Sequence, residues 1–130
     1  YLIDRYAPDL IVNLGTCGGF EGVVNQGDVI LVEQTIVYDI VELMGDLDIA
    51  NYYASSLDVS WLANPLPYPA RRATIASADS GLLILRAVSD IVNEREGEAY
   101  DNIEIFNERA KKIMRKLVAQ LPGWLNAVQL

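Results

Sequence analysis

The stretch Asp9-Leu-Ile-Val-Asn-Leu-Gly-Thr-Cys-Gly-Gly19 indicates the fold more directly than any other part of the chain. Its first half is a short apolar run rich in branched side chains, typical of a strand buried on both faces inside an α/β sheet. Gly15, Gly18 and Gly19 then predict a tight turn at the carboxyl end of that strand. Open α/β sheets bind small molecules at this edge, although a purely structural turn explains the stretch equally well.

Composition narrows the classes of function. The 130 residues suffice for one domain, and 52% hydrophobic with 22% charged residues is typical of a globular protein. No apolar run predicts a membrane span, and the net charge of −8 argues against nucleic acid as a partner. The single cysteine favours a reducing, cytoplasmic environment, and the lack of histidine excludes a histidine triad or metal site. No metal or cofactor is expected.

Residue patterns along the chain predict an α/β domain without internal repeats. Strands are expected over residues 10–14, 71–78 and 82–88, and over 29–32 and 35–41 as two strands or one bent strand. Residues 1–6 resemble the last turn of a helix, residues 42–69 an irregular aromatic loop, and residues 93–100 a charged surface loop.

The last helix is predicted to begin after Asp101, with Glu104 completing a capping box, and to end at Pro122-Gly123. Apolar residues at helical spacing are expected to face the sheet, namely Ile105, Phe106, Ile113, Met114, Leu117, Val118 and Leu121.

The glycine-rich stretch does not fit two common nucleotide-binding motifs. A dinucleotide fingerprint starting at Gly15 would need glycine at the positions of Cys17 and Phe20, and no Gly-Lys-Ser/Thr follows for a phosphate loop.

A second candidate feature is Asp90, which ends the most hydrophobic predicted strand in Arg86-Ala-Val-Ser-Asp90. If the two strands are parallel, this carboxylate lies at the same edge as the glycine turn. A partly buried carboxyl group holds its proton more readily, as a general acid must, and Ser89 could orient it by a hydrogen bond. Alternatively, Ser89 and Asp90 simply cap the following element.

Four stretches in fixed order carry a resemblance to a known family: residues 11–19, 26–30, 74–79 and 85–90. This arrangement resembles the purine nucleoside phosphorylase/nucleosidase superfamily, and most closely its methylthioadenosine/S-adenosylhomocysteine nucleosidase branch. The similarity covers most of the chain except residues 42–69. It implies a three-layer sandwich with a central, mostly parallel mixed sheet flanked by helices, expected here in truncated form.

The resemblance also implies the reaction, which is cleavage of the N-glycosidic bond of 5′-methylthioadenosine, S-adenosylhomocysteine or a related purine nucleoside. Asp90 would protonate or hydrogen-bond the purine at N7, and Ser89 would position Asp90. The sugar would pass through an oxocarbenium-like transition state stabilised electrostatically.

The same resemblance implies four substrate-binding residues. Thr16 would lie near the ribose and the attacking water, and Cys17 and Gly18 would line the base pocket. Arg86 would border the ribose through water or through residues that contact it.

Asn13 separates two possible nucleophiles. Phosphorylases of the superfamily usually carry an arginine at this place, two residues before the turn glycine, where it grips phosphate. Asparagine is neutral and offers no charged fork to an oxyanion, so water is the expected nucleophile. A phosphate-dependent purine nucleoside phosphorylase stays open as an alternative.

The chain departs from the family pattern in two places. Residues 1–130 are expected to form a single nucleosidase-like domain that lacks the family's N-terminal strand region, with its water-activating acid, and a central segment near residues 79–81, with the Met-Glu pair that binds the ribose hydroxyls. By local patterns alone, Asp79-Ser80-Gly81 predicts a tight hairpin between antiparallel neighbours. Loss of these groups predicts little or no turnover.

Two further interpretations remain open: a non-catalytic purine-binding or dimerising remnant, and an unrelated α/β domain. The aromatic residues Tyr52, Tyr53 and Trp61 are expected to cover the site or a subunit partner. Family members are commonly oligomeric, so a homo-oligomer, a dimer, is expected.

Overall fold

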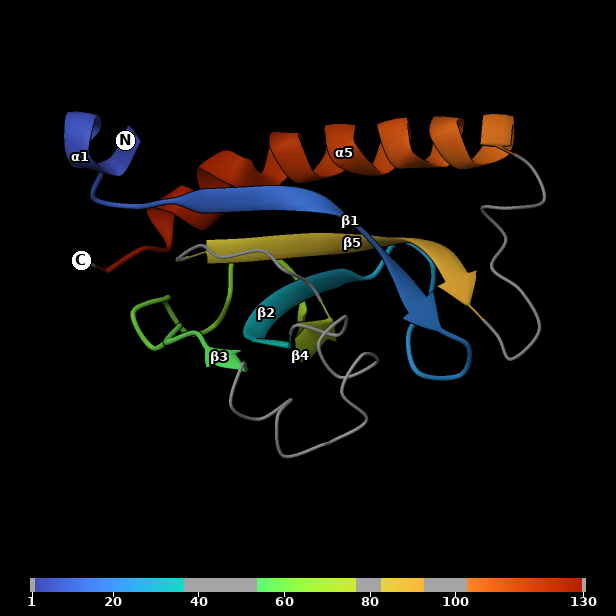
Figure 1. Cartoon of the computed structure of the whole chain (residues 1–130), viewed down its shortest axis with the longest axis horizontal. Coiled ribbons are helices and arrows are strands. Elements are labelled where there is room, and N and C mark those ends of the chain that lie inside the picture. The colour runs from blue at the N-terminus through green and yellow to red at the C-terminus, as the bar shows by residue number, and fades with distance from the viewer. Residues whose placement is uncertain (1, 37–53, 77–82, 93–102, 130) are drawn as a thin grey trace.

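A computed structural model describes residues 2–36, 54–76, 83–92 and 103–129 of the chain. Its elements build one mixed sheet with a long helix lying across it (Figure 1). In chain order they are α1 (Leu2–Tyr6), β1 (Val12–Phe20), β2 (Val29–Ile36), β3 (Ser55–Ser56), β4 (Arg71–Ala76), β5 (Leu83–Val92) and α5 (Ile103–Asn126).

Strand β5 occupies the centre of the sheet between β1 and β2. It pairs with β1 in parallel and with β2 in antiparallel orientation. The other edge of β2 carries β4 in parallel, while the end of β2 pairs with the short antiparallel strand β3. The predicted α/β class with a mixed sheet is therefore confirmed, and residues 29–36 form one strand with a register shift between Val32 and Gln34.

The core consists of two apolar clusters, one on each face of β5. Leu83, Leu85 and Ala87 face α5, where they meet Ile113 and Leu117. Ile84 and Val88 face the other way and contact Ile30 and Val32 of β2. Every residue of β5 from Leu83 to Asp90 is buried, as expected of an inner strand that is covered on both faces.

The prediction of a tight turn at the glycines of β1 is wrong. The strand stays extended through Gly15, Gly18 and Gly19, and the chain turns only after Phe20. Parallel pairing with β5 continues as far as Phe20 opposite Val92, so β5 provides the ladder partner through the glycine stretch. Strand β1 is also only partly buried rather than covered on both faces.

The predicted hairpin between β4 and β5 is also corrected, although residues 79–81 lie outside the described part. The two strands are not neighbours, because β2 lies between them and pairs with both. Local turn signals could not reveal this arrangement, since it depends on a strand about 40 residues earlier in the chain.

Helix α5 passes Pro122-Gly123, where the sequence predicted its end. The continuation buries Trp124 completely, with its ring 6.3 Å from that of Tyr68. Gly123 serves this contact, because a Cβ there would lie 2.6 Å from the Tyr68 hydroxyl. The apolar stripe is narrower than predicted, since Ile105 and Val118 are exposed while Ile113 and Leu117 are buried.

Several predictions fall outside the described residues: the cap at Asp101, the loop over residues 93–100, and Tyr52 and Tyr53. Trp61 is described, and it packs against the α5-side core cluster. Residues 2–6 are helical, as predicted. Neither described helix combines the length and hydrophobicity that crossing a membrane would require.

Candidate functional site

The parallel pairing of β1 and β5 brings the two predicted features to one edge of the sheet. Thr16 lies opposite Ala87, Cys17 opposite Val88, and Gly18 opposite Asp90. In Figure 1 both strands end on the same side of the molecule. We call this edge, formed by Thr16–Gly19 and Ser89–Asp90, the glycine–aspartate rim.

A β-bulge shapes the rim. The register shifts between Cys17 and Gly18, which leaves Ser89 as an extra residue in β5. Bulges bend a strand locally and re-aim its side chains, and they are frequent beside active sites. The sequence alone gave no sign of this bulge, because its position depends on which residues of two distant strands face each other.

Asp90 is the buried acid of the rim, with 8% of its surface exposed. Its Oδ1 atom is buried and has no hydrogen-bond partner among the described residues. An unpartnered buried carboxylate oxygen is costly, so it calls for an explanation such as a ligand or a catalytic role. This atom is the most informative feature of the site.

Ser89 has a different partner from the one predicted. Its hydroxyl donates to the carbonyl of Cys17 at 3.3 Å, so its proton is used on β1 rather than on Asp90. Gln26 Nε2 donates to the carbonyl of Ser89 at 3.0 Å. Ser89 therefore connects the bulge to Cys17 of β1 and to Gln26 in the loop before β2. Ser89 can affect the position of Asp90 only through the backbone of β5.

The loop before β2 lies beside the rim. Val88 exchanges backbone hydrogen bonds with this loop, receiving one from Gly27 and donating one to Asp28. Asp28 is also paired with Arg71 of β4 at 3.1 Å. The stretch 26–30 thus lies directly beside the rim, and Gln26 is a residue whose place the sequence analysis did not identify.

Arg86 lies on the face of β5 opposite α5, since Leu85 and Ala87 face that helix. It is 6% exposed, and its Nη1 atom donates to Asn13 Oδ1 at 2.9 Å. The same atom lies 3.3 Å from the Asn13 carbonyl. A cationic side chain is thus held against β1, immediately before the glycine stretch.

Cys17 lies on the same strand, two residues beyond Gly15, and is partly buried. Burial raises the pKa of its thiol, and the positive charge of Arg86 opposes that rise. A raised pKa keeps the thiol protonated at neutral pH, so Cys17 is suited to lining a pocket rather than to attacking a substrate.

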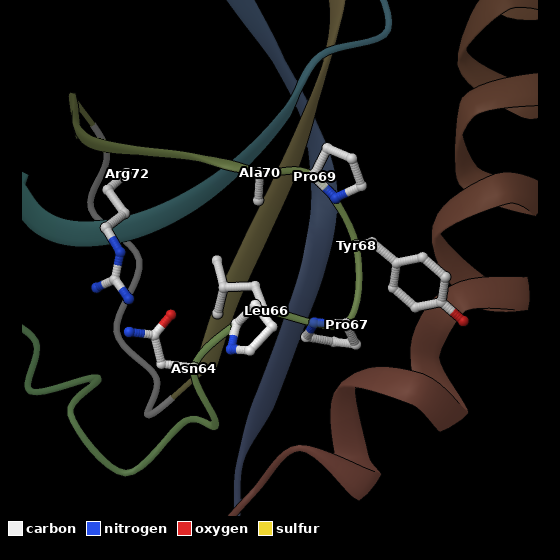
Figure 2. A pocket seen from close by; sticks show the side chains of 8 residues that line it. Asn64, Leu66, Pro67, Tyr68, Pro69, Ala70 and Arg72 are labelled. Atoms are coloured by element: carbon white, nitrogen blue, oxygen red, sulfur yellow. The ribbon is translucent and has the colours of Figure 1, made fainter.

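A separate hollow lies away from the rim. It measures about 450 Å³ and is formed by Asn64–Ala70 together with Arg72. Figure 2 shows Asn64 and Arg72 reaching into it while the ring of Tyr68 turns toward α5. None of the predicted site residues lines this hollow, so we assign it no part in the chemistry of the rim.

The described residues of the rim offer groups for acid–base and electrostatic chemistry. They contain no group of three or more acidic or cysteine side chains placed to hold a metal ion. The rim combines the buried carboxyl group of Asp90 with the exposed Gly18 opposite it, and the guanidinium of Arg86 lies nearby.

Comparisons with known proteins give short matches. No protein-family model matches the chain. Over 39 residues it is 41% identical to the 5′-methylthioadenosine/S-adenosylhomocysteine nucleosidases of Tolumonas auensis and Bacillus subtilis, and 36% identical to that of Anoxybacillus flavithermus. These residues amount to 30% of this chain and 17% of each relative. Over that stretch, the chain is similar in sequence to the 5′-methylthioadenosine/S-adenosylhomocysteine nucleosidases.

Proposed function

We propose that the glycine–aspartate rim is the base-binding half of a purine nucleosidase site. The substrate would be 5′-methylthioadenosine, S-adenosylhomocysteine or a related nucleoside, and the reaction hydrolysis of its N-glycosidic bond. The observation that carries the proposal is the buried, unpartnered Oδ1 of Asp90 opposite Gly18. The sequence similarity to nucleosidases supports the same assignment.

Asp90 acts on the leaving group in this proposal. The glycosidic bond breaks with both electrons moving to the purine, and a proton from Asp90 at N7 neutralises the charge that develops there. Oxygen from water completes the sugar product, and the water proton restores the carboxyl group. Gly18 and Cys17 line the base, while Thr16 lies toward the ribose and Arg86 borders it.

The nucleophile is proposed to be water. Asn13 stands where a phosphorylase would place arginine, and its amide oxygen is already occupied by Arg86. Phosphate sites rely on cationic forks, which asparagine lacks. Release of free sugar without phosphate supports a hydrolase, whereas phosphate-dependent formation of a sugar 1-phosphate would assign the chain to the phosphorylases.

The first test replaces Asp90 by Asn, which keeps the shape of the side chain and removes the transferable proton. Adenine release from methylthioadenosine should fall by about 100-fold or more, the range of a general acid. Asp9→Asn is the matched control, because Asp9 is exposed and precedes β1. Full activity in Asp90→Asn would contradict the assignment of the acid.

Calorimetry with adenine separates catalysis from binding. Heat on titration together with adenine release from the nucleoside supports the proposed enzyme. Heat without product supports a purine-binding remnant, and absence of both would remove the purine assignment altogether. A dimer, which we also propose from the resemblance, is checked on the same sample by sedimentation equilibrium.

A further inference from the structure

Asn13 of the neighbouring strand binds the guanidinium of Arg86. Asn13 presents both its side-chain oxygen and its backbone carbonyl to Nη1, at 2.9 and 3.3 Å. A third acceptor, the carbonyl of Leu85, lies at 3.4 Å. A buried guanidinium needs such acceptors, because an unpartnered charged group is expensive to remove from water.

Gly15 provides the space for this arrangement. It pairs with Arg86 across the sheet, and a Cβ at Gly15 would lie 3.1 Å from Nη1 and 3.2 Å from the central guanidinium carbon. The guanidinium therefore lies close against the β1 backbone, between Asn13 and the glycine–aspartate rim. A larger residue at position 15 would push it away from the strand.

The chemistry of asparagine suits this task. An aspartate at position 13 would form an ion pair and offset the charge of Arg86, whereas an amide oxygen fixes the guanidinium without adding an opposite charge. Arginine has several rotatable bonds, so fixing its tip on a partner removes alternative positions that would place the charge elsewhere.

We propose that Asn13 is a positioning residue that holds the guanidinium of Arg86 against β1 beside Gly15, so that its positive charge stays immediately before the glycine–aspartate rim. Its contribution to catalysis rests on the proposed nucleosidase function, in which Arg86 borders the ribose. The position itself is a property of the folded chain and is measurable without any turnover.

The reactivity of the Cys17 thiol, which lies on the same strand as Asn13, depends on where the guanidinium of Arg86 lies. Cys17 is the one cysteine in the sequence, and among the described residues Arg86 is the charged group whose field acts on its thiol. That field lowers the pKa of Cys17 against the opposing effect of burial. If the guanidinium leaves its place, the pKa of Cys17 rises and fewer thiolates are present to react.

The test is the rate of Cys17 alkylation by iodoacetamide across a range of pH in the full chain. Asn13→Ala should slow alkylation about threefold or more at pH 8 and move the midpoint of the pH profile upward. In an Arg86→Met background the same Asn13→Ala change should have no further effect, because Asn13 acts through Arg86. Asn107→Ala, on the exposed face of α5, is the matched control and should leave the profile unchanged.

An unchanged profile in Asn13→Ala, or an equal shift with and without Arg86, would overturn the proposal. If Asn13→Ala does not fold, Asn13→Ser replaces it, since serine is too short to reach the guanidinium yet stays polar. Failure of the unaltered chain to bind adenine would count against the proposed purine site alone, because the alkylation profile would still decide the role of Asn13.

Discussion

Gly19 is the position on β1 with least room for a side chain. A Cβ there would overlap the Val24 side chain and lie 3.0 Å from Val88 Cγ1. The glycines of this stretch are typical of a turn, but at position 19 glycine allows close contact between an extended strand and its neighbours. Sequence alone cannot distinguish a glycine that forms a turn from one that allows close packing, because both need a residue without a Cβ.

Gly19→Ala is therefore expected to destabilise the fold by about 1 to 3 kcal/mol, the usual cost of overpacking. Gly18→Ala is the matched control, because among the described residues its Cβ would meet Val92 alone, at 3.3 Å, and its cost should be smaller. Urea unfolding measures both free energies. Trimming the obstructing side chain with Val24→Ala should restore part of the stability of Gly19→Ala, and equal losses for Gly18→Ala and Gly19→Ala would contradict this interpretation.

At the scale of elements, the sequence predicted well what depends on local patterning. Strand β5 was identified as the most buried strand, and it is. The long helix was found, but its end was placed at Pro122, since a proline is a strong local signal to stop. Burial of Trp124 under Tyr68 overrides that signal, and no local pattern reveals this contact because the two residues are far apart in the chain.

Helix α5 offers a test of which apolar residues carry the packing. Leu117 is 1% exposed and belongs to the core cluster, whereas its neighbour Val118 is 55% exposed. Leu117→Ala should cost about 2 to 5 kcal/mol, and Val118→Ala about 0.5 kcal/mol or less. Thermal or urea unfolding distinguishes them, and comparable losses at both positions would show that the helix faces the sheet differently.

At the scale of the whole molecule, the candidate site depends on pairings between distant strands. The sequence contained the residues of the rim, and the assumption of parallel strands was enough to expect Thr16–Gly19 near Asp90. The bulge at Ser89, the loop contact from Gln26 and the Asn13–Arg86 hydrogen bond could not be predicted from the sequence. Each depends on the register between segments 60 or more residues apart. Register is set by the packed sheet as a whole.

The proposed site is expected to bind the base better than the ribose, and this leads to a prediction about its affinity for adenine and for methylthioadenosine. In this proposal the rim supplies groups for the base, and Thr16 and Arg86 lie near the ribose. The resemblance assigns the ribose hydroxyls to a Met-Glu pair in a central segment expected to be missing near residues 79–81. Each additional well-formed hydrogen bond to a ligand contributes about 1 kcal/mol or more, so two lost ribose contacts should erase most of the advantage of nucleoside over free base.

Adenine and methylthioadenosine are therefore expected to bind this chain with dissociation constants within about tenfold of each other. Calorimetry with both ligands measures the ratio, using Asp90→Asn to prevent turnover during the titration. The same substitution should weaken both ligands alike, since it changes only the contact to the base. Binding of methylthioadenosine more than about 100-fold tighter than adenine would contradict the prediction, because the chain would then have to bind the ribose hydroxyls with groups other than that Met-Glu pair.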